Sequence, residues 1–131
     1  QRAGHGDIER MTAVLDGQEA DIASGGTGVE FDLEFHFAIA AATQNSALIA
    51  VTQAISDILS QSRGDSLLSN RRSRMSLKSH RRILEAIESR RPGDAERAMH
   101  RHIADIDREV HDLPSESVGM AGGQRIAPTA R

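Results

Sequence analysis

The chain of 131 residues contains no cysteine, no tryptophan and no tyrosine, and only three phenylalanines. The absence of cysteine excludes a disulfide scaffold and thiolate metal sites, and it is compatible with the cytoplasmic location that we expect. A core with so few aromatic residues must be aliphatic, which suits helices rich in Ala, Leu, Ile and Met. No run of 18 apolar residues and no signal peptide are present, so we expect no membrane association.

The chain also lacks a strongly basic composition. Its formal net charge is −3, which argues against a nucleic-acid-binding surface on these residues. The paired arginines at 71–72, 81–82 and 90–91 are interpreted as solvated helix surface. The first residue is not Met, and we expect a fragment or a processed chain.

Hydrophobic residues recur at helical spacing, without strand-like alternation. Residues 1–113 are expected to form one domain, an all-α antiparallel bundle of about five to six helices. Five helices are expected near 8–23, 28–43, from Asn45 or Ser46 onward, 71–90 and 93–112. The pattern weakens at 63–66, Leu113-Pro114 should end the last helix, and the Ser-, Gly- and Pro-rich residues 114–131 are expected to be a disordered tail.

Several residues indicate where helices begin and which faces are buried. Asp7 is a candidate N-cap, and Thr27 with Glu30 matches a capping box. Pro92 suits a first helical turn. Apolar stripes are expected in the third helix (Leu48, Val51, Ile55, Ile58 and Leu59) and facing inward in the fifth (Ala95, Ala98, Met99, Ile103, Ile106 and Val110).

The stretch 31–42 carries all three phenylalanines and is apolar on every side, which is typical of a buried helix. Asp32 and His36 lie four residues apart within it and therefore share one helix face. Burying such groups without partners costs roughly 2–7 kcal/mol even for a neutral polar group. The partners of these two side chains therefore bear on function.

Helical phase separates the six histidines. His80 and His102 fall within apolar stripes and, like His36, are expected to face the core, whereas His100 and His111 face outward and His5 precedes the first helix. Three imidazoles and one carboxylate suit a divalent cation, Zn²⁺ or Ni²⁺ first, with Mn, Co and Fe as alternatives. Alternatively, the three histidines and Asp32 are separate core residues, and each has its own hydrogen-bond partner.

Four motifs follow one another over about residues 7–112: Asp32-x-x-x-His36, Thr43-Gln44-Asn45-Ser46-x-Leu48, His80-Arg81-Arg82-Ile83-Leu84-Glu85-Ala86-Ile87 and Gly93-Asp94-x-x-x-Ala98-Met99-x-x-His102-Ile103. Their order and spacing resemble the FCD domain, the C-terminal effector-binding domain of the FadR subfamily of GntR-type transcription regulators.

The resemblance implies a homodimeric helical bundle that binds a divalent metal through Asp32, His36, His80 and His102. It also implies a small organic-acid effector beside the metal, which would modulate DNA binding. Arg72 and Ser76 precede His80 at steps of four residues and are candidate effector contacts, although Arg72 also fits a solvated surface position.

The chain departs from the family pattern in two ways. Ser79 stands where the family often has Glu. No segment resembles the family's winged helix-turn-helix, and the usual first helix of the domain is not recognised either. We therefore expect a truncated chain or an incomplete gene product, with DNA contacts made only by a domain outside these residues.

The sequence favours a sensor domain without enzymatic activity over two alternatives. A metal-dependent hydrolase or oxidase would need a base beside the metal, and Glu34, the nearest carboxylate in sequence, lies roughly 200° around the helix from both Asp32 and His36. A structural dimerisation bundle without metal is the other alternative. Neither the metal nor the effector can be identified from sequence.

Overall fold

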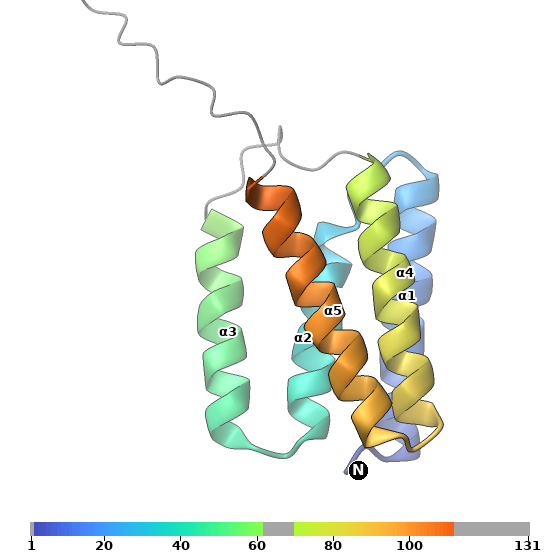
Figure 1. The fold of residues 1–131 in the computed structure, drawn as a ribbon, viewed down its shortest axis with the longest axis vertical. Coiled ribbons are helices and arrows are strands. Elements are labelled where there is room, and N and C mark those ends of the chain that lie inside the picture. The colour runs from blue at the N-terminus through green and yellow to red at the C-terminus, as the bar shows by residue number, and fades with distance from the viewer. Residues whose placement is uncertain (1, 62–69, 112–131) are drawn as a thin grey trace, which may run out of the picture.

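A computed structural model describes residues 2–61 and 70–111. Within these ranges the chain forms five helices and no strand: α1 (His5–Ala23), α2 (Val29–Ala42), α3 (Ser46–Gln61), α4 (Asn70–Glu88) and α5 (Pro92–His111). Consecutive helices run in opposite directions (Figure 1), which confirms the expected all-α antiparallel bundle. The segment 63–66, the stop at Leu113-Pro114 and the tail 114–131 lie outside the described residues.

The first two helices begin differently from the sequence-based expectation. Gly4, not Asp7, is the N-cap of α1, and the Asp7 carboxylate reaches back one turn to accept the Gly4 N–H at 2.7 Å. The Thr27–Glu30 capping box is also wrong. Gly28 precedes α2 with a positive φ of 67°, and its N–H donates to Asp21 of α1 at 2.8 Å, so a side chain from the preceding helix anchors this start.

The starts of α3 and α5 follow the prediction. The Asn45 side-chain oxygen accepts the N–H groups of Ala47 and Leu48 at 3.0 and 3.3 Å, so that it caps α3. Pro92 is the first residue of α5, where its missing N–H leaves no intrahelical bond unmade.

The core lies where α1, α2 and α4 meet, and α5 packs against α4. Met11, Leu15 and Phe35 are fully buried there, together with Ile83 at 1% exposure. Gly17 allows α1 and α2 to approach closely, because a Cβ at this position would lie 2.4 Å from the Phe31 ring.

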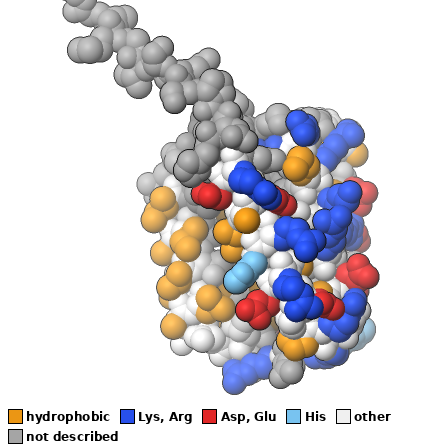
Figure 2. All heavy atoms as spheres, in the orientation of Figure 1, with side chains coloured by type: hydrophobic (Ala, Val, Ile, Leu, Met, Phe, Trp, Pro, Cys, Tyr) orange, Lys and Arg blue, Asp and Glu red, His pale blue; other side chains and the backbone are white. Residues whose placement is uncertain are grey.

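Two apolar stripes are exposed rather than buried. Ile103 and Ile106, predicted to face inward on α5, are 56% and 38% exposed, so this part of the prediction is wrong. The α3 stripe is also exposed, at Leu48, Val51, Ile55 and Ile58. The reason is geometric, since α2 is the one described helix that α3 contacts. Figure 2 shows the hydrophobic side chains gathered over α3.

Of the remaining residues in the predicted α5 stripe, Ala98 and Met99 pack against the core and Ala95 is half-buried. The side chains of Val110 and, in the α3 stripe, Leu59 lie outside the described part. No helix in the described part of the chain has the length and apolarity needed to cross a membrane.

Candidate metal centre

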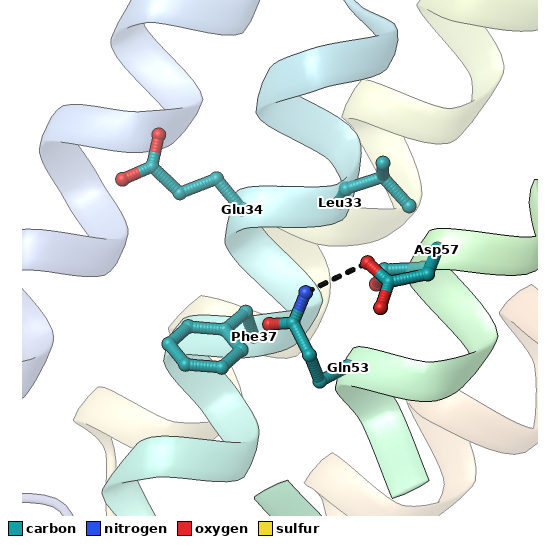
Figure 3. A pocket seen from close by; sticks show the side chains of 6 residues that line it. Leu33, Glu34, Phe37, Gln53 and Asp57 are labelled. Carbon is teal, nitrogen blue, oxygen red and sulfur yellow. Dashed lines mark hydrogen bonds between the residues drawn. The ribbon is translucent and has the colours of Figure 1, made fainter. Parts of the chain in front are cut away.

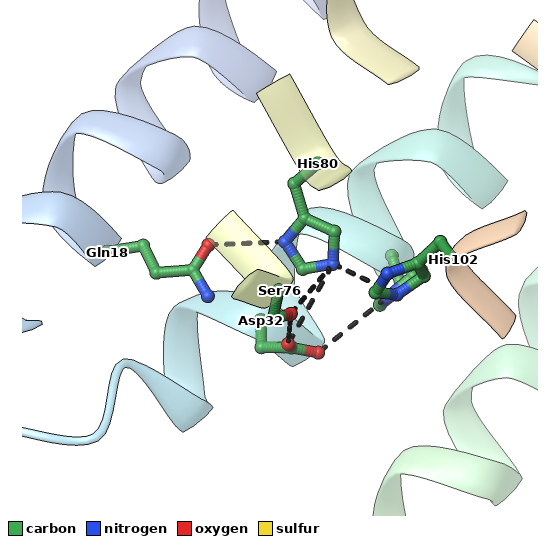
Figure 4. A network of polar contacts seen from close by, with 6 residues as sticks. Gln18, Asp32, Ser76, His80 and His102 are labelled. Carbon is green, nitrogen blue, oxygen red and sulfur yellow. Dashed lines mark hydrogen bonds and ion pairs between the residues drawn. The ribbon is translucent and has the colours of Figure 1, made fainter. Parts of the chain in front are cut away.

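Three helices bring His36, His80 and His102 together inside the bundle. His80 Nε2 lies 3.2 Å from His102 Nε2, which in turn lies 3.3 Å from His36 Nε2. The same nitrogen of each imidazole therefore faces a common point. Figure 4 shows the His80 and His102 rings facing each other near Asp32. The helical phase of all three residues predicted this inward orientation.

The Asp32 carboxylate borders the histidines from α2. Its Oδ1 lies 3.7 Å from His36 Nε2 and its Oδ2 lies 3.8 Å from His80 Nε2. These separations are longer than direct hydrogen bonds. The structure thus places all four predicted ligands in one cluster, with the three histidines closest to one another.

Burial favours the neutral form of the imidazoles of the cluster. Removal from water lowers the pKa of His36 and His102, and it lowers the pKa of His80 to about 3, while the negative charge of Asp32 opposes each shift. A neutral imidazole has a free lone pair on one ring nitrogen, which is the form that binds a metal ion.

The spacing of these nitrogens fits a single ion. Two imidazole nitrogens bound to one Zn²⁺ at about 2.0–2.1 Å lie roughly 2.9–3.4 Å apart, depending on the coordination geometry. The two distances of 3.2 and 3.3 Å fall in that range. The donor set and its geometry are therefore suited to a borderline divalent cation.

The cluster is closed on one side and accessible on the other. The His80 side chain has no solvent exposure, whereas those of His36 and Asp32 are 26% and 29% exposed. The Phe35 ring covers the closed side, with its centroid 4.7 Å from that of His80. A small molecule would therefore approach from the side of His36 and Asp32.

The two candidate effector residues occupy different positions. The Ser76 hydroxyl donates a 2.7 Å hydrogen bond to Asp32 Oδ2 and lies 3.4 Å from His80 Nε2, so it adjoins the cluster. Arg72 is half-buried one turn earlier on α4.

Sequence reasoning missed Gln18, whose side-chain oxygen lies 3.2 Å from His80 Nδ1. Gln18 is only 1% exposed. A signal was present in the sequence, because Gln18 follows Leu15 by three residues and precedes Ile22 by four, which places a polar residue in the apolar stripe of α1.

Other polar groups lie away from the cluster. His100 is exposed, as predicted, and His5 lies at the start of α1, where it pairs with Glu9 at 3.2 Å. The Glu34 carboxylate, considered above as a base, pairs instead with Arg10 at 3.7 Å.

A hollow of about 300 Å³ lies between α2 and α3 (Figure 3). It is lined by Leu33, Glu34, Phe37, Gln53, Ser56 and Asp57. Three of its polar groups already have partners, since Gln53 donates to Asp57 at 2.9 Å and Glu34 pairs with Arg10 at 3.7 Å. It is open to solvent and includes none of the four predicted ligands.

Comparison with known proteins agrees with this architecture. The family model for the FCD domain matches residues 1–105, a range that includes all four residues of the cluster. Comparison with curated proteins gives no match. The chain therefore belongs to the FCD-domain family, the effector-binding domains of GntR-type transcription regulators.

Proposed function

We propose that this chain is the sensing and dimerising part of a GntR-type regulator, and that it binds a divalent metal and a small carboxylate effector. The observation that carries the proposal is the convergence of three imidazole nitrogens beside the Asp32 carboxylate. Zn²⁺ or Ni²⁺ suits this set of three nitrogens and one oxygen best, and Mn, Co or Fe is compatible with it.

The proposed ligands are Asp32, His36, His80 and His102. They come from α2, α4 and α5, so an ion held by all four would join three helices. Metal binding of this kind contributes directly to folding free energy, because the unfolded chain does not hold the ligands together. The ion would supply positive charge and open coordination positions to an anionic effector.

The effector is proposed to be a small carboxylate that binds at the accessible side of the cluster. Ser76 already contacts Asp32 there. Ser73, on the preceding turn of α4, is 3% exposed, and its hydroxyl has no hydrogen-bond partner among the described residues. Ser73 and Ser76 are hydroxyl donors, and Arg72 would supply positive charge for a carboxylate.

The partner is proposed to be a second copy of the chain, bound through the α3 stripe formed by Leu48, Val51, Ile55 and Ile58. Each of these residues is 43% or more exposed. Apolar residues gathered on one exposed face indicate a protein interface. An effector that favours one dimer geometry would change the spacing of DNA-binding domains attached to the two copies.

Metal analysis of protein purified without an affinity tag tests the proposal. We expect about one equivalent of a transition metal per chain, lost in His80→Ala and retained in His100→Ala, because His100 is exposed and outside the cluster. Less than about a tenth of an equivalent in the unmodified protein, with no uptake of added Zn²⁺ or Ni²⁺, would rule out the metal site.

A thermal-shift screen of small carboxylates, on metal-loaded and chelated protein, tests the effector. A compound that binds only the folded state raises the melting temperature. We expect a carboxylate to shift the metal-loaded form more than the chelated form. If no carboxylate shifts the metal-loaded form, the effector proposal is wrong, although the metal site can still hold.

A further inference from the structure

Gln18 is a buried amide on α1, the one helix of the four packed around the cluster that supplies none of the proposed ligands. Its side-chain oxygen faces His80 Nδ1 at 3.2 Å (Figure 4). Burying an amide is costly unless it is hydrogen-bonded, so this contact accounts for the presence of Gln18 in an apolar stripe. The contact joins α1 to the cluster through a single side chain.

The contacts of the two ring nitrogens of His80 determine which of them carries the proton. A neutral imidazole carries one N–H and one lone pair. The Gln18 oxygen can only accept a hydrogen bond, so Nδ1 must be the nitrogen that carries the proton. The lone pair then belongs to Nε2, which faces His102 Nε2 at 3.2 Å.

The surroundings hold both partners in this orientation. A Cβ at Gly28 would lie 2.9 Å from Gln18 Cγ, so the start of α2 closes tightly over the Gln18 side chain. The Phe35 ring lies 4.7 Å from the His80 ring with an interplanar angle of 33°, which restricts its rotation. Both side chains are therefore closely packed in this orientation.

We propose that Gln18 is a positioning residue that holds His80 in its Nδ1–H tautomer and thereby directs the Nε2 lone pair into the cluster. The tautomer is a property of the protein alone, whereas the consequence for metal affinity rests on the proposed function. Partners that orient metal-binding histidines in this way typically change metal affinity by about 10–100-fold when removed.

The first measurement uses the chelated protein. Ring ¹⁵N shifts from two-bond ¹H–¹⁵N spectra distinguish the two neutral tautomers, and we expect His80 to be the Nδ1–H form. A predominantly Nε2–H His80 in the unmodified protein would overturn the inference whether or not any variant folds. This result is independent of whether a metal binds.

The second measurement compares variants by Zn²⁺ competition with a chromophoric chelator. Gln18→Met keeps the length of the side chain but lacks the oxygen, and we expect His80 to lose its tautomer preference and Zn²⁺ affinity to fall about 10–100-fold. Gln18→Glu keeps an accepting oxygen and should retain both the tautomer preference of His80 and the affinity for Zn²⁺. Gln53→Met, at an exposed position on α3, is the matched control and should change neither the His80 tautomer nor the Zn²⁺ affinity.

The outcomes separate this inference from the proposed function. If Gln18→Met binds Zn²⁺ as tightly as the unmodified protein and keeps the Nδ1–H tautomer, the role of Gln18 is wrong while the metal site stands. If the unmodified protein binds no metal, the proposed function is wrong, and the tautomer measurement still decides the role of Gln18.

Discussion

His80 and His102 are 22 positions apart in the chain, and their Nε2 atoms face each other at 3.2 Å inside the bundle. Both side chains are buried. Two lone pairs at this distance repel unless a proton or a cation lies between them, so the contact requires a shared proton or an ion. This pair lies at the centre of the cluster.

His102→Ala should abolish stoichiometric metal binding, because it removes one of the three converging imidazole nitrogens. His100→Ala is the matched control, since His100 lies on the same helix but is exposed. The measurement is metal content per chain, together with the rise in melting temperature on adding Zn²⁺. Equal metal content in the two variants would contradict the prediction.

The stability of the metal-free protein should fall as the pH is lowered from about 6.5 toward 3. Burial places the folded-state pKa of all three histidines below the ordinary value, and that of His80 at about 3. Between the folded and unfolded pKa values the unfolded chain binds more protons, so acid favours unfolding. The stabilisation is complete above the unfolded pKa and decreases below it.

Urea unfolding in a chelating buffer measures this effect. Each such histidine adds up to about 1.4 kcal/mol per pH unit to the slope. The informative window is about pH 5–7, above the ordinary carboxyl range. A free energy of unfolding that is constant across this window would show that the cluster is not held neutral.

Ile55→Glu should weaken self-association, because it introduces a charge at the centre of the exposed α3 stripe. Ile55 is 52% exposed in the single chain. A charge left unpaired at a desolvated interface costs at least about 2 kcal/mol, which raises the dimer dissociation constant by more than about tenfold.

Sedimentation equilibrium measures this change. Ala50→Glu is the control, because Ala50 is exposed on α3 but lies about 140° around the helix from Ile55. It should leave the dissociation constant nearly unchanged. A chain that is monomeric without any substitution would contradict the proposal that α3 forms the dimer interface.

Phe35→Ala should destabilise the fold by about 3–5 kcal/mol, the usual cost of emptying a fully buried aromatic site. Phe35 has no solvent exposure and packs against the His80 ring. Phe37→Ala should cost less, because Phe37 is only half-buried and its ring faces Arg10. Chemical denaturation compares the two variants, and equal losses would show that the Phe35–His80 packing has no special role.

The helices and the inward orientation of the candidate ligands could be read from sequence, because both depend on local periodicity. Asp32 and His36 share a face through their spacing alone, and the apolar neighbours of His80 and His102 indicate which side of each helix is buried. The four motifs also indicated the family. These features required no knowledge of how the helices pack.

Only the tertiary structure determines which neighbouring helix covers each helix face, because periodicity carries no such information. An apolar stripe predicts that a surface will be buried, but not whether a neighbour within the chain buries it, and so Ile103 and the α3 stripe are exposed. The start of α2 depends on Asp21 from the preceding helix, and the contact of Gln18 with His80 joins residues 62 positions apart. Helical phase orients a side chain on its own helix, and only packing between helices determines which atom it meets.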